Sequence, residues 1–137
     1  MKSHFSLTDN EFLIQLETAT LKPEFFDHQA HLRLAWLNIN RFGIETAVKK
    51  TSFYLKKYVH SLDEQDKFNQ TLTVAALKAV YHFKLKSKST NFKNFIEEFP
   101  RLLYNFKDLM AMHYGFDIYH SEYAKKTYLA PDLLPFD

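Results

Sequence analysis

Apolar and polar residues alternate along most of the chain with the period of an α-helix, about 3.6 residues. In residues 44–61 one side is apolar and the other carries lysines. Capping signals divide the pattern: Thr8 and Glu11 have the capping-box spacing, Asp27 is a good N-cap residue, and Gly43 is a good helix terminator. The pattern predicts helices over 9–20, 28–41, 44–61, 67–85, 91–98 and 100–112, and a last short turn over 122–127.

This pattern predicts an all-α fold: one compact helical bundle of about six helices, formed as a single domain over residues 1–137. The chain has only 2 glycines and 4 prolines, too few for the frequent turns of a β-sandwich or barrel. Residues 130–136 contain two prolines and three large apolar residues. We expect them to form an extended C-terminal tail along the body of the bundle.

Some polar residues fall on the apolar stripes of the predicted helices. At about 100° per residue, His28 and His31 lie one turn apart on the stripe of 28–41, whereas Arg33 falls beside that stripe. Ala35 follows the two histidines and leaves space next to them. The inner side of 67–85 carries further polar residues: Asn69 and Thr73, with Gln70 at its flank. His113 continues the stripe of 100–112.

If these residues converge, they form a polar pocket inside a helical bundle, which is a frequent place for a binding site. We therefore expect a pocket for a small polar molecule, lined by His28, His31, Asn69, Gln70 and Thr73. The histidines would supply acid–base or hydrogen-bonding chemistry near neutral pH. The spacing identifies no catalytic residue and requires no cofactor. The structural alternative is that each polar group is a core residue paired with a neighbour.

A second hypothesis is a divalent metal held by His28 and His31 with a third group, for which His113 is the candidate. Two histidines three residues apart are a weak metal signal. Cysteine is absent, which excludes thiolate metal sites and a cysteine nucleophile. The scarcity of glycine excludes a glycine-rich phosphate loop.

A third hypothesis is an interaction module. Residues 67–96 carry six lysines and no acid, whereas the net charge of the whole chain is +2. This basic segment could bind an acidic partner or nucleic acid, and many phenylalanines could leave a face for a homodimer. Nucleic acid is the less expected of these partners, because only 3 of the 18 basic residues are arginine. No signal peptide or membrane span is apparent, so we expect a cytoplasmic protein without membrane contact.

Three sequence motifs resemble those of a group of small bacterial helical proteins of uncharacterised function. The first is HxxHLRxAW, here His28 to Trp36, and the last is PDLxP, here Pro131 to Pro135. Between them, the group has a segment similar to Y-H-E-T-x-T, where this chain reads Phe68-Asn69-Gln70-Thr71-Leu72-Thr73. The resemblance implies a shared helical fold and no established activity.

The middle motif departs from the group at the two positions that matter for metal binding. A histidine and a glutamate beside the HxxH pair would complete a plausible ligand set. Here these positions are Asn69 and Gln70, whose neutral amides are poor ligands for transition metals. Either this chain has lost a metal site, which would leave a degenerate one here, or the site was always a hydrogen-bonding pocket. Both alternatives count against metal catalysis in this protein.

Overall fold

The computed structural model describes residues 3–136 and shows an all-helical fold, as predicted. In the described chain no strand forms. Short 3₁₀ turns precede α1, α2 and α4. The helices are α1 (Asp9–Glu17), α2 (His28–Phe42), α3 (Ile44–Ser61), α4 (Gln70–Lys84), α5 (Phe92–Glu98), α6 (Arg101–Tyr104), α7 (Phe106–His113) and α8 (Glu122–Lys126).

The predicted capping residues begin the first two helices. Thr8 accepts a hydrogen bond from the Glu11 backbone N–H, and the Glu11 carboxylate accepts one from the Thr8 N–H, which completes the capping box of α1. The carboxylate of Asp27 accepts from the Ala30 N–H at the start of α2. Gly43 has φ 78° and ψ 167° between α2 and α3, a conformation open to glycine and strained for other residues.

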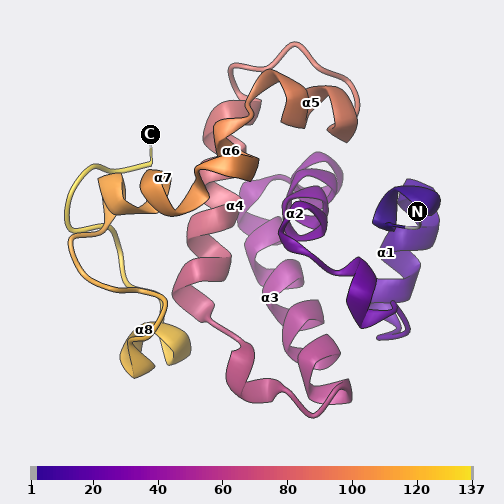
Figure 1. The fold of residues 1–137 in the computed structure, drawn as a ribbon, viewed down its shortest axis with the longest axis horizontal. Helices are drawn as coiled ribbons and strands as arrows, with labels where there is room; N and C mark the ends of the chain where they lie inside the picture. Colours follow the sequence, from indigo (N-terminus) through magenta and orange to yellow (C-terminus); the bar gives the residue numbers. More distant parts are fainter. Residues whose placement is uncertain (1–2, 137) are drawn as a thin grey trace.

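Helices α2, α3 and α4 pack against one another and form the centre of the molecule (Figure 1). Every residue from 32 to 39 of α2 is buried, because neighbouring elements cover this helix on all sides. Helices α1, α5, α6 and α8 add to the outside of this centre, and the buried apolar residues form one continuous cluster.

Three predicted helices differ from the observed ones. The helix predicted over 9–20 ends at Glu17, because Ala19 has a positive φ of 58° that no helix continues. The helix predicted over 67–85 begins only at Gln70, and Asn69 is its N-cap rather than part of its inner face. The helix predicted over 100–112 is divided at Asn105, which has φ −129° and ψ 32°. The break leaves the carbonyl of Leu102 without its helical partner and free to accept a hydrogen bond from another element.

Arg33 is buried, with 4% of its surface exposed, although helical periodicity places it beside the apolar stripe of α2. Its guanidinium donates to the backbone oxygens of His4 and Leu7 and to the Asp9 carboxylate, at 2.7, 3.0 and 2.8 Å. It also donates to Nδ1 of His4 at 3.2 Å. Arg33 is therefore buried because the N-terminal segment folds over this side of α2.

The tail after α8 lies along the body of the protein, as the apolar residues near the C-terminus predicted. Tyr114 donates a hydrogen bond to the Leu129 carbonyl, and the backbone N–H of Leu133 donates to the His113 carbonyl. The side chain of Phe136 is buried and stacks on the His113 ring, with centroids 4.1 Å apart. None of the helices formed by residues 3–136 combines the length and apolar composition that a bilayer-spanning helix requires.

Candidate functional site

A cavity of about 610 Å³ lies between α2, α3, α4 and the α6–α7 segment. This volume is within the usual range for small-molecule sites, about 300–1,000 Å³. Much of the wall is apolar, so any occupant makes mostly apolar contacts there. The apolar wall consists of Phe26, Leu32, Ala35, Leu55, Val59, Phe68, Leu72, Ala76, Leu77, Leu103 and Phe106.

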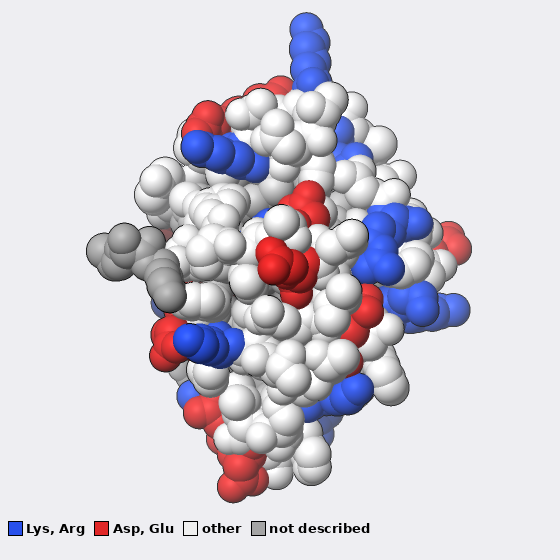
Figure 2. Space-filling view, turned by 90° about the vertical axis from the view of Figure 1, so that its right-hand side faces the viewer, with Lys and Arg blue, Asp and Glu red and all other residues white. Residues whose placement is uncertain are grey.

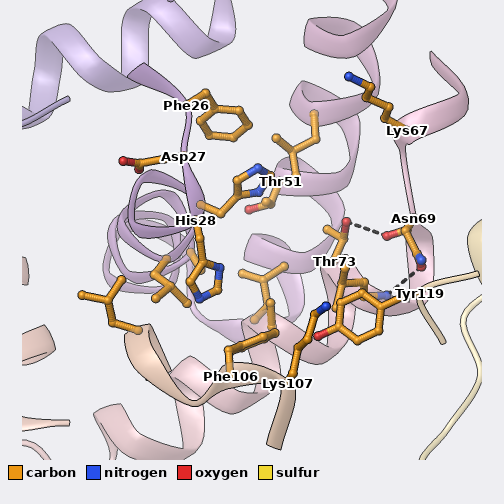
Figure 3. A pocket seen from close by; sticks show the side chains of 18 of the residues that line it. Phe26, Asp27, His28, Thr51, Lys67, Asn69, Thr73, Phe106, Lys107 and Tyr119 are labelled. Carbon is orange, nitrogen blue, oxygen red and sulfur yellow. Dashed lines mark hydrogen bonds between the residues drawn. The ribbon is translucent and has the colours of Figure 1, made fainter. Parts of the chain in front are cut away.

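Four of the polar residues singled out in the sequence line this cavity: His28, His31, Asn69 and Thr73. In Figure 3, His28 enters from α2, while Asn69 and Thr73 stand on the opposite side at the start of α4. The polar residues that lie on the apolar stripes of α2 and α4 are therefore found around one cavity. Gln70 does not belong to the cavity wall, because its amide donates to the Ser52 hydroxyl on α3 at 3.1 Å.

His28 is the first residue of α2, and its ring is held in a defined orientation. Its Nε2–H donates to the Leu102 carbonyl at 2.9 Å, the carbonyl that the break at Asn105 leaves free. The ring also packs against Phe106, with centroids 4.9 Å apart. In the neutral ring, Nδ1 then carries the lone pair and is a hydrogen-bond acceptor.

His31 lies one turn further along α2 and stacks on Phe26, with centroids 4.0 Å apart and planes at 25°. Among the described residues, neither of its ring nitrogens has a hydrogen-bond partner. The side chains of His31 and His28 are both exposed at the cavity wall and are not core residues, while the stacked Phe26 ring removes water from one face of the His31 imidazole. Burial, and secondly the neighbouring His28, lower the pKa of His31 to about 4. At neutral pH His31 is therefore uncharged, with one donor and one acceptor nitrogen.

The polar groups from α4 are largely committed to the fold. The Asn69 amide oxygen accepts from the Leu72 N–H, and its nitrogen donates to the Ile118 carbonyl at 2.8 Å. The Thr73 hydroxyl donates to the Asn69 carbonyl at 2.7 Å. Both residues line the cavity, but their hydrogen bonds stabilise the start of α4. This agrees with the alternative that these polar groups are paired within the fold.

The cavity also contains polar residues that the sequence reasoning did not select. Thr51 on α3 is buried and accepts from the Asn38 amide at 2.9 Å, which leaves its own hydroxyl hydrogen for another acceptor. Thr51 lies on the apolar stripe of residues 44–61, and this position in the sequence could have indicated that it faces the interior. Tyr119 reaches the cavity from the loop after α7, and its buried hydroxyl has no partner among the described residues. Nothing in the sequence pattern of that loop indicates this contact.

Four charged residues line the cavity, two of each sign: Asp27, Lys67, Lys107 and Asp108. All four are exposed. The Lys67 ammonium pairs with Glu64 at 3.1 Å, outside the cavity wall, and the Lys107 ammonium lies 5.4 Å from the centre of the Tyr119 ring. The charges of these four side chains cancel.

The expected third metal ligand, His113, does not belong to the site. Its Nδ1–H donates to the Leu134 carbonyl at 2.8 Å, and its ring lies under Phe136 in the C-terminal tail. Within residues 3–136, no group of three or more histidine, aspartate or glutamate side chains is placed to hold a metal ion. The suggested set of His28, His31 and His113 is therefore wrong as a ligand triad.

The lysines of the basic segment 67–96 are partly engaged within the fold. Lys67 pairs with Glu64, and the ammonium groups of Lys78 and Lys84 lie 5.1 and 5.7 Å from the ring centres of Tyr128 and Trp36. On the face shown in Figure 2, acidic and basic side chains are interspersed. These contacts give the segment a structural role beside any role in binding a partner.

In comparisons with known proteins, no family model matches this sequence, and no curated protein and no solved structure matches it either.

Proposed function

We propose that this protein binds a small molecule with a polar group in the cavity between α2, α3, α4 and the α6–α7 segment, with His31 and His28 as the polar contacts. The observation that carries this proposal is the His31 ring. It is accessible from the cavity and fixed against Phe26, and both of its nitrogens lack a partner among the described residues. The His31 side chain is exposed at the cavity wall, so both of its nitrogens are free to bind a ligand that enters the cavity.

The orientation of the second imidazole supports the same proposal. The Leu102 carbonyl holds the Nε2–H of His28, which leaves Nδ1 as an acceptor. Two neighbouring rings with defined hydrogen-bonding roles are what a binding site needs to orient a ligand. No described carboxylate hydrogen-bonds either ring, so the pair lacks the partner that usually activates a catalytic histidine. We therefore propose binding and assign no reaction.

A screen of small aromatic and aliphatic compounds, detected through the imidazole nitrogens of ¹⁵N-histidine-labelled protein, tests the proposal. Ala76 on α4 lines the cavity, so Ala76→Phe fills part of it. Ala111 is exposed on α7 and does not line the cavity, which makes Ala111→Phe the matched control. We expect compounds that shift the His31 signals in the unmodified protein and in Ala111→Phe but not in Ala76→Phe. Compounds that shift His31 equally in all three proteins, or a screen without any such compound, would contradict the proposal.

A further inference from the structure

The uncharged polar residues of the cavity wall include both kinds of hydrogen-bonding group. His28 offers an acceptor at Nδ1, and Thr51 has a hydroxyl hydrogen to donate. His31 offers one donor and one acceptor on the same ring. A ligand that satisfies this set carries a donor and an acceptor close together, as a carboxamide or a lactam does.

The charge distribution argues against an ionic ligand. The two acids and two bases that line the cavity leave no net charge, and each of the four is exposed. Transfer of an ion from water into an apolar cavity costs several kcal/mol unless an opposite charge meets it. Burial keeps His31 neutral near pH 7, so this ring supplies no positive charge to an anion.

The shape and composition of the wall define the rest of the ligand. Eleven apolar side chains line the cavity, and the Phe26 and Phe106 rings lie against the two imidazoles. Apolar burial contributes about 25 cal/mol per Å² of area removed from water. A ligand gains most here if an apolar ring carries the polar group.

We infer that the ligand of this cavity is an uncharged carboxamide or lactam attached to an apolar ring. This inference rests on the proposed function and specifies the chemical class that the site selects. The amide N–H donates to an imidazole acceptor, while the amide oxygen accepts from the second imidazole or from Thr51. The apolar ring occupies the space between Leu32, Leu72 and Ala76.

Three probes of nearly the same shape test the inference: benzamide, benzoate and benzamidine, which are neutral, anionic and cationic near pH 7. Each is titrated into ¹⁵N-histidine-labelled protein at pH 7.5, and the His31 imidazole shifts give the Kd. We expect benzamide to bind at least about tenfold more tightly than either charged probe. We also expect Ala76→Phe to abolish the benzamide shift and Ala111→Phe to retain it.

The outcomes separate this inference from the proposed function. Equal binding of all three probes, or tighter binding of a charged one, would overturn the neutral-ligand inference and leave the proposed function standing. Shifts that persist in Ala76→Phe would place the probes outside the cavity and overturn both. Absence of a His31 shift with any of the three probes, together with an empty compound screen, would overturn the proposed function itself.

Discussion

Protonation of His31 should destabilise the fold as the pH falls. The ordinary pKa of 6.5 applies to the unfolded chain, whereas the pKa in the folded protein is about 4. Between these values the unfolded state binds more protons than the folded state. The stabilising contribution of the neutral ring is therefore complete above about pH 6.5 and decreases as the pH falls towards 4.

The magnitude follows from the pKa difference. Each pKa unit corresponds to about 1.4 kcal/mol, so the full difference corresponds to about 3 kcal/mol. Water reaches the ring through the cavity and screens part of this effect, and we expect about 1–2 kcal/mol. The other titrating groups, including the buried His4, remain in a variant at position 31 and cancel in the comparison.

Urea denaturation of His31→Phe and of the unmodified protein at pH 7.5 and 4.5 measures this contribution. Trp36 is the only tryptophan and is buried, so its fluorescence reports unfolding. The unmodified protein should lose about 1–2 kcal/mol more between the two pH values than His31→Phe does. His60 is exposed on α3, and His60→Phe should behave like the unmodified protein. The reasoning is refuted if His31→Phe keeps the full pH dependence or if His60→Phe loses it.

Three further variants test the contacts that build the fold, each by chemical denaturation. Arg33→Ala removes the buried guanidinium that holds the N-terminal segment and should lower the free energy of unfolding by about 3–5 kcal/mol. Arg41 is exposed, and Arg41→Ala should lower it by less than about 1 kcal/mol. Similar losses for the two variants would contradict the role of Arg33. Asn69→Ala loses both the N-cap of α4 and the hydrogen bond to the Ile118 carbonyl, and should lower the free energy of unfolding by about 2–3 kcal/mol. Asn91→Ala loses only an N-cap and should lower it by about 1 kcal/mol. Equal losses would show that the hydrogen bond to Ile118 contributes nothing. Gly43→Ala meets no neighbouring atom but must adopt a positive φ, so it should cost about 1–2 kcal/mol, and an unchanged midpoint would count against that strain.

Local signals in the sequence were sufficient for most of the helices. The capping box at Thr8 and the N-cap at Asp27 act within a few residues, and both occur where the sequence placed them. The break at Asn105 could not be predicted in this way, because the freed Leu102 carbonyl is paired by His28, 74 residues earlier in the chain. A helix end that depends on such a distant partner has no local sequence signal.

The candidate site was predictable to the extent that it follows helical periodicity. His28 and His31 share the inner stripe of α2, and this stripe faces the cavity. Periodicity could not show that the Asn69 amide donates a hydrogen bond to the Ile118 carbonyl. It also could not show that Tyr119 lines the cavity from a loop. It also misplaced Arg33, because a helical wheel does not include the N-terminal segment that covers it.

The most direct test of the central claim is a benzamide titration that follows the His31 imidazole in the unmodified protein, Ala76→Phe and Ala111→Phe. We expect a saturable shift of the His31 signals in the unmodified protein and in Ala111→Phe, and none in Ala76→Phe. A His31 ring that does not respond to benzamide or to any compound of the screen, or that responds equally when the cavity is filled, would contradict it.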